Sequence, residues 1–186
     1  MRKRLPLWLT SLRILLIPVL VMLFFIPGFW AAWSALLVYA IAAATDFLDG
    51  YLARRYQAVS AIGRFLDPLA DKMFVCAVLF LLAAFNRLEG IWVIPAIIIL
   101  LREFFVAGLR EHIASKEVSL PVSRLAKWKT AIQMTAIGFL IVGPHNPWPQ
   151  LPHMMIGWLG LTVAAGLTLY TGALYYLKVD PYLRAE

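Results

Sequence analysis

Residues 46–55 read DFLDGYLARR, and they close a long apolar run that begins near Ala31. After a short polar gap, residues 63–71 read GRFLDPLAD and open a second apolar run. Two pairs of acids thus stand where two apolar segments meet. Ionisable side chains beside long apolar helices are costly unless they are paired or bind a ligand, so they usually mark a functional site. These two stretches predict both a helical pair and a site at its polar end.

The composition of the chain predicts a membrane protein. It has 186 residues, of which 62% are hydrophobic and 15% charged, and its mean hydropathy is +0.80. Soluble domains are only about half apolar, and a spanning helix needs about 20 largely apolar residues. We therefore expect an all-α integral membrane protein in which residues 1–186 form a single six-helix domain. The expected segments are Leu9–Ile26, Ala31–Leu52, Phe65–Phe85, Ile91–Leu109, Leu125–Val142 and Met154–Leu177.

The basic residues predict the orientation of these segments. If the N-terminus faces the cytoplasm, every one of the 17 Lys and Arg residues except Arg87 falls on the cytoplasmic side. The positive-inside rule then places both termini in the cytoplasm. The net charge of +7 lies on that face, where it suits anionic head groups or phosphorylated substrates rather than nucleic acid. The basic residues 1–4, MRKR, and the apolar run after them could also form a cleaved signal peptide. Arg13 and Pro18 interrupt that run, which favours a first membrane span that is not cleaved off.

The spacing of the acids predicts that they converge. Asp46 and Asp49 are three residues apart, and Asp67 and Asp71 are four apart, so each pair lies on one face of a helix. A short loop, Arg55 to Gly63, makes the two helices antiparallel neighbours. Carboxylate oxygens suit Mg²⁺ or Mn²⁺, and the lack of His or Cys ligands argues against zinc or copper. The alternative is that the acids only form ion pairs with Arg54, Arg55, Arg64 and Lys72.

The full motif is more specific than either pair. Between Asp46 and Asp71 it reads D-x2-D-G-x2-A-R-x8-G-x3-D-x3-D, which resembles the signature of the CDP-alcohol phosphatidyltransferase family. Similar segments follow at residues 9–18, LTSLRILLIP, at 101–111, LREFFVAGLRE, and at 126–134, AKWKTAIQM. The resemblance implies a homodimeric, multi-pass protein of the bacterial inner membrane whose active site faces the cytoplasm. It also implies an enzyme of phospholipid biosynthesis that takes the phosphatidyl group from CDP-diacylglycerol and releases CMP.

The resemblance further implies a role for each residue of the motif. Asp46, Asp49 and Asp67 would bind two divalent cations, Mg²⁺ or Mn²⁺, and Asp71 would complete the second site and act as general base. Gly50 would let the nucleotide approach the helix closely, and Arg54 would offer its planar fork of donors to the diphosphate. The residues implied in binding CDP-diacylglycerol are Thr10, Arg13, Gly50, Arg54 and Ser60.

Four further cations predict a site for the second substrate. They lie at the cytoplasmic ends of the fourth and fifth segments, where they can bind a phosphate: Arg102, Arg110, Lys127 and Lys129. Such a site suits glycerol 3-phosphate better than neutral serine, but it suits inositol phosphate equally well. Each cation also fits the role of an ordinary positive-inside anchor. Residues 101–111 and 126–130 are similar to family members that use glycerol 3-phosphate, which implies phosphatidylglycerol phosphate as the product.

A transporter of divalent cations is the alternative from another functional class. Its acids would line a conduction path and would be expected nearer the middle of the membrane. In this chain the acids gather at one face beside Arg54, which would repel a permeating cation. The sequence therefore favours the transferase.

Overall fold

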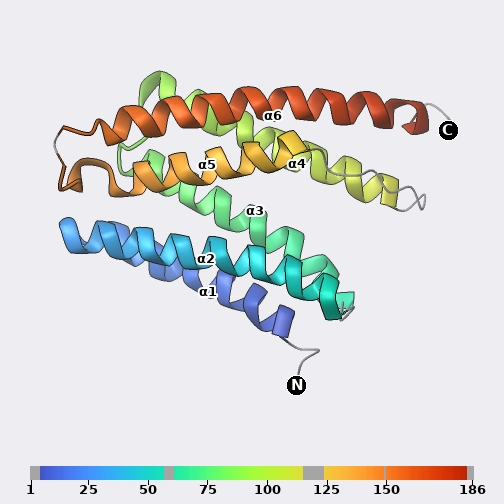
Figure 1. The fold of residues 1–186 in the computed structure, drawn as a ribbon, viewed down its shortest axis with the longest axis horizontal. Coiled ribbons are helices and arrows are strands. Elements are labelled where there is room, and N and C mark those ends of the chain that lie inside the picture. The colour runs from blue at the N-terminus through green and yellow to red at the C-terminus, as the bar shows by residue number, and fades with distance from the viewer. Residues whose placement is uncertain (1–4, 57–60, 115–123, 149, 184–186) are drawn as a thin grey trace.

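The structure, a computed structural model, describes residues 5–56, 61–114, 124–148 and 150–183, and within these the side chains except those at 5–9, 46–56, 61–65, 67, 114 and 124. Figure 1 shows a bundle of long helices without a strand in the described ranges. This confirms the all-α prediction. The helices are α1 Leu5–Phe25, α2 Phe29–Tyr56, α3 Ala61–Ala84, α4 Val93–Ala114, α5 Arg124–Val142 and α6 His153–Leu183, with 3-10 turns η2 Gly90–Trp92 and η3 Gly143–His145.

Each helix overlaps one predicted apolar segment, but several extend into polar sequence. α2 continues past Leu52 to Tyr56, and α6 continues past Leu177 to Leu183. α3 begins at Ala61, so residues 57–60 alone separate it from α2, a shorter link than predicted. Arg and Lys have high helix propensity and Tyr an intermediate one, so a helix need not end where its apolar stretch ends.

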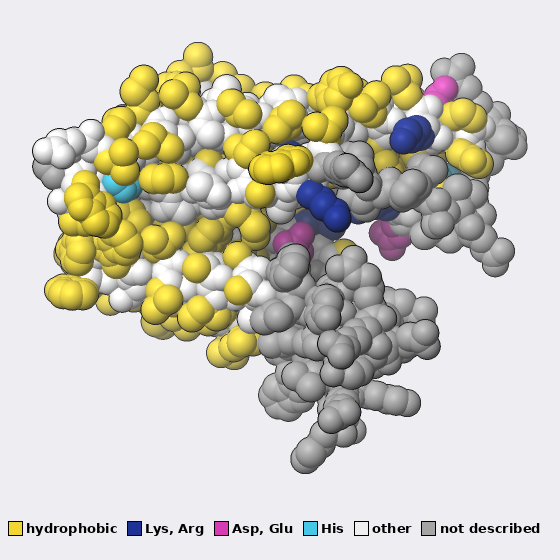
Figure 2. Space-filling model, in the orientation of Figure 1, with side chains coloured by type: hydrophobic (Ala, Val, Ile, Leu, Met, Phe, Trp, Pro, Cys, Tyr) yellow, Lys and Arg dark blue, Asp and Glu magenta, His cyan; other side chains and the backbone are white. Residues whose placement is uncertain are grey.

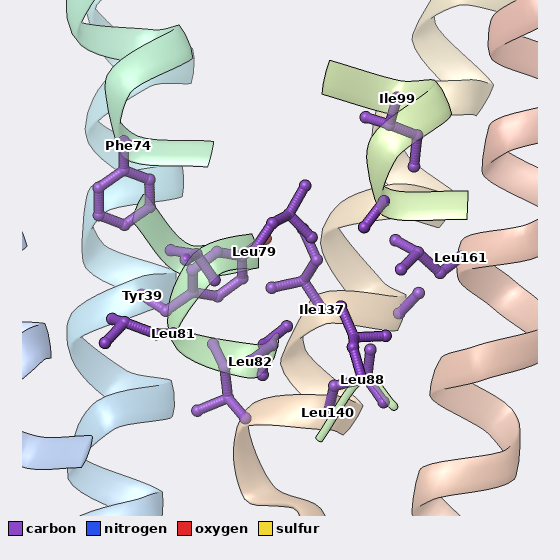
Figure 3. Packing of buried hydrophobic residues seen from close by; sticks show 14 of the residues in the cluster. Tyr39, Phe74, Leu79, Leu81, Leu82, Leu88, Ile99, Ile137, Leu140 and Leu161 are labelled. Atoms are coloured by element: carbon purple, nitrogen blue, oxygen red, sulfur yellow. The ribbon is translucent and has the colours of Figure 1, made fainter. Parts of the chain in front are cut away.

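The helices pack into one continuous apolar core. α1 contacts both α2 and α3, α5 contacts α2 and α6, and α4 contacts α6. Figure 3 shows core side chains of α2 to α6 meeting between the helices. The rings of Tyr39 on α2 and Phe74 on α3 stack with centroids 5.8 Å apart, so side chains of these two helices meet, although both helices pack mainly against α1 in the described residues. The acid-bearing helices α2 and α3 are therefore joined mainly through α1.

The surface of the bundle is apolar as well as its core. Gly90–Ile113 and His153–Leu183 are long and apolar enough to cross a membrane, whereas Thr10–Phe25 and Phe29–Thr45 are apolar but shorter. In an apolar 18-residue stretch of each of these two long helices, only 22% and 33% of the stretch is buried in the structure. A soluble protein would bury such helices in its core. Their exposure indicates an integral membrane protein.

Candidate active site

The predicted acids lie on two consecutive helices. Asp46 and Asp49, with Gly50 and Arg54, belong to the C-terminal part of α2, and Asp67 and Asp71 belong to the first half of α3. Among these four acids, the structure describes the side chain of Asp71, which is half-buried. Ser60 lies outside the described residues. Both pairs of acids lie on helices, as their spacing predicted. The convergence of the four carboxylates stays a prediction.

The Asp71 side chain lines a small cavity between four helices. The cavity has a volume of about 80 Å³, and its wall includes Tyr39 from α2, Glu103 from α4, and Lys129 and Gln133 from α5. Lys129 and Gln133 are buried, and Glu103 is half-buried. A carboxylate, a second acid and a buried ammonium thus line one small, partly open cavity in an apolar bundle. We refer to this volume as the Asp71 cavity.

Glu103 is the centre of an ion-pair network in the wall of the Asp71 cavity. Its Oε1 accepts a hydrogen bond from Lys129 Nζ and a second from Arg102 Nη1, at 3.2 Å. The other end of the Arg102 guanidinium, Nη2, donates to Thr171 Oγ1 on α6 at 3.1 Å. The side chains of Lys129 and Arg102 are only 5% and 12% exposed, and the carboxylate of Glu103 contacts both of these buried cations, while Asp71 also lies near Lys129.

A larger, cationic cavity adjoins the first. It has a volume of about 480 Å³, and its wall carries three cations, Lys72, Arg102 and Arg110, against two acids, Glu103 and Glu111. Lys72 and Glu103 line both cavities, so the two share a wall. The Arg110 guanidinium lies over the ring of Tyr175, 5.4 Å from its centroid, which holds it toward α6. Figure 2 shows Lys, Arg and acidic side chains in the right half of the molecule, whereas the described surface of the left half is largely apolar.

The predicted phosphate-binding cations therefore separate into three positions. Arg102 and Arg110 line the cationic cavity, and Lys129 lines the Asp71 cavity. Lys127 is exposed and lines neither of them. On α1, Thr10 and Arg13 are almost fully buried, at 1% and 2% exposed, and neither lines the two cavities, so their role in binding CDP-diacylglycerol stays a prediction.

Sequence reasoning missed several members of this site. It did not predict that Glu103 binds Lys129, which is 26 residues away in the chain. It also missed Tyr39, Gln133 and Thr171. A signal did exist for Glu103, since an acid inside the apolar run of α4 requires a cationic partner. Tyr39 and Thr171 lie in apolar helices, where the sequence pattern does not separate them from ordinary packing residues.

Comparison with known proteins gives a consistent result. The sequence profile of the CDP-alcohol phosphatidyltransferase family matches residues 3–170. A CDP-diacylglycerol–glycerol-3-phosphate 3-phosphatidyltransferase of Rickettsia typhi is 43% identical over 182 residues, which cover 97% of this chain and 99% of the relative. A protein of the same name from Cereibacter sphaeroides is 37% identical, covering 96% of both chains. A rice cardiolipin synthase (CMP-forming) is 37% identical over 94% of this chain and 57% of its own length.

Proposed function

We propose that this chain, which belongs to the CDP-alcohol phosphatidyltransferase family, transfers the phosphatidyl group of CDP-diacylglycerol to glycerol 3-phosphate and releases CMP. Near full-length relatives at 37–43% identity carry the name of this reaction. The observation that carries the proposal within the molecule is the shared wall between the Asp71 cavity and the cationic cavity. It puts a candidate base beside a pocket suited to a phosphorylated acceptor.

The acids would hold two divalent cations, Mg²⁺ or Mn²⁺. Asp46, Asp49, Asp67 and Asp71 form an all-carboxylate donor set on α2 and α3, which suits hard ions. The half-buried Asp71, in a cavity that also holds Glu103 and Lys129, fits a site in which charge must be compensated inside an apolar bundle. Bound ions would supply Lewis acidity and a template for the diphosphate.

The residues of the chain would carry out a direct displacement. The hydroxyl oxygen of glycerol 3-phosphate attacks the β-phosphorus of CDP-diacylglycerol, and its proton passes to the Asp71 carboxylate. As the new phosphorus–oxygen bond forms, the bond to CMP breaks and CMP leaves with the electron pair. Such transfers depend mainly on positioning and charge neutralisation. Arg54 would bind the diphosphate, and Gly50, Thr10, Arg13 and Ser60 would position the rest of CDP-diacylglycerol.

The cationic cavity would hold the acceptor. Arg102 and Arg110 line it, and the charge-assisted hydrogen bonds of guanidinium groups suit a phosphate. Lys129 would sit between the acceptor and Asp71, held by Glu103. Lys127 lies outside both cavities, so we propose that it acts only through its charge at longer range. A water-soluble phosphate acceptor fits this charged volume better than serine does.

The wider setting follows from the sequence. We propose that residues 1–186 form one domain with six membrane spans, and that both termini and the active site face the cytoplasm. The bacterial inner membrane is the proposed location, because the relatives from Rickettsia and Cereibacter are bacterial. The proposed assembly is a homodimer, as the family resemblance implies.

An acceptor panel tests the proposed reaction. Purified protein in detergent is supplied with CDP-diacylglycerol and Mg²⁺, and CMP release is measured with glycerol 3-phosphate, inositol phosphate, serine or phosphatidylglycerol. The last is included because one relative is named a cardiolipin synthase. We expect glycerol 3-phosphate to give the fastest release, and Arg110→Gln to raise its KM about tenfold or more. Fastest release with any other acceptor would reject the acceptor assignment.

A further inference from the structure

A third cavity lies at the opposite end of the bundle from Asp71. It has a volume of about 280 Å³ and is formed where α1, α3 and α5 end and α2 begins, at the left of Figure 1. Most of its wall is apolar, including Phe24, Phe85 and Ile141, and its two ionisable side chains are Arg87 and His145. None of the residues assigned to catalysis or substrate binding lines it. We refer to it as the Arg87 cavity.

The guanidinium of Arg87 has no anionic partner among the described residues. Its Nη1 is buried without a hydrogen bond and packs so closely on Gly143 that a Cβ there would lie 2.0 Å away. The neighbouring Glu89 is exposed and does not pair with it. The main chain of Arg87 is fixed, because its carbonyl accepts a hydrogen bond from Trp158 Nε1 at 2.8 Å. Burial lowers the pKa of Arg87 from its ordinary value, which reflects the same poor solvation.

Tryptophans at this end of the bundle indicate its depth in the membrane. Trp30 and Trp148 are 81% and 58% exposed, and Trp33 meets Trp148 edge-on with centroids 6.2 Å apart. Trp92 and Trp158 stack with centroids 5.1 Å apart. Tryptophan gathers at the level of lipid head groups, where an apolar ring can keep its N–H in a polar layer. Arg87 therefore lies where the phosphates of one leaflet are expected.

We infer that the Arg87 cavity binds the head-group phosphate of an anionic phospholipid. Arg87 would supply the charge-assisted hydrogen bonds that its guanidinium lacks within the chain. The apolar wall would lie beside the acyl chains, and Phe25 and Ile26 at its rim are 71% and 56% exposed. A free phosphate ion would gain nothing from this wall, whereas a lipid fits both parts of the cavity. In the predicted topology Arg87 is the one Lys or Arg on this side.

Native mass spectrometry of the purified, delipidated protein tests this inference. Dioleoyl phosphatidylglycerol is titrated against wild type, Arg87→Gln, Arg87→Lys and the control Lys178→Gln, which removes an exposed charge on α6. We expect Arg87→Gln to weaken the tightest binding step about tenfold or more. Arg87→Lys should retain most of it, and Lys178→Gln all of it. Release of CMP from CDP-diacylglycerol should stay at the wild-type rate in Arg87→Gln, so this test is separate from that of the proposed function.

A second variant probes the cavity without altering Arg87. Ala32 is 8% exposed and lines the cavity, so Ala32→Leu should fill part of it and weaken phosphatidylglycerol binding while the guanidinium remains. Equal binding by wild type and both Arg87→Gln and Ala32→Leu would overturn the inference. So would equal binding of dioleoyl phosphatidylcholine, whose head group has no net charge. Displacement of the lipid by millimolar inorganic phosphate would overturn it too, because the site would then be one for a soluble anion.

Discussion

Glu103 is the residue on which both halves of the candidate site depend. Its carboxylate binds Lys129 in the Asp71 cavity and Arg102 in the cationic cavity, so it fixes the spacing between them. Two cations so deeply buried would repel each other without it. We therefore regard Glu103 as a positioning residue for the acceptor site. Asp71 has the complementary role, because it faces the same volume as Lys129 and is the candidate base.

Glu103→Gln tests the positioning role. The substitution keeps the shape of the side chain but removes the charge that offsets Lys129 and Arg102. We expect a loss of stability of about 1–3 kcal/mol and a higher KM for glycerol 3-phosphate, with the KM for CDP-diacylglycerol little changed. Thermal unfolding in detergent and steady-state kinetics measure the two effects. The control for stability is Glu111→Gln, an exposed acid on the same helix that lines the cationic cavity but forms no ion pair with another described residue, and it should keep the wild-type Tm.

Asp71→Asn separates a base from a metal ligand. Asparagine keeps the size of the side chain and one oxygen that can bind a cation, but it cannot accept the acceptor's proton. Turnover should fall by at least a hundredfold, while binding of CDP-diacylglycerol survives better than it does in Asp46→Asn. Equilibrium binding and CMP release are measured on the same preparations. If Asp71→Asn and Asp46→Asn lose binding equally, Asp71 is mainly a ligand and another group is the base.

At the scale of helices, the sequence predicts the positions of the helices along the chain better than the contacts between them. Long apolar runs between Pro and Gly turns locate the helices, because a membrane helix must be apolar along most of its length. The acids of α2 and α3 could be found for the same reason, since charge is rare in such runs. The contact of Arg102 with Thr171, 69 residues away, could not be predicted. It depends on the rotation of α4 against α6, which the packing of many side chains decides together.

Close packing of α5 on α6 depends on glycine. A Cβ at Gly157 would lie 2.6 Å from Cγ and Cδ2 of Leu140, which is fully buried and cannot move aside easily. Gly157→Ala should therefore destabilise the protein by about 1–3 kcal/mol. Gly166→Ala on the same helix is the control, because a Cβ there meets nothing within 4 Å. Thermal unfolding should separate the two variants. Equal Tm values would show that these helices tolerate a wider spacing.

At the scale of the whole molecule, the two ends of the bundle differ in charge. Several cationic side chains and the candidate active site belong to one end, whereas Arg87 belongs to the other. This polarity fits a protein that takes its soluble substrate from one side of the membrane only. It also agrees with the charge distribution from which the orientation was predicted.

Fusions to the C-terminus test the predicted orientation. A fluorescent protein that matures only in the cytoplasm should fluoresce when it follows residue 186 in bacterial cells. Alkaline phosphatase, which is active only after export, should be inactive at the same position. Alkaline phosphatase inserted instead in the loop near Arg87, which is predicted to face away from the cytoplasm, should be active. An active phosphatase at the C-terminus would mean an odd number of spans or the opposite orientation.

The most direct test of the central claim follows both products of the reaction in sealed vesicles. Purified protein is reconstituted with CDP-diacylglycerol and Mg²⁺, and radiolabelled glycerol 3-phosphate is added. The proposed function predicts that label enters the chloroform-soluble lipid in a one-to-one ratio with released CMP, and that a chelator stops both. Release of CMP without labelled lipid would contradict transfer and indicate hydrolysis. Uptake of divalent cations into the vesicles with neither product would instead support the transporter.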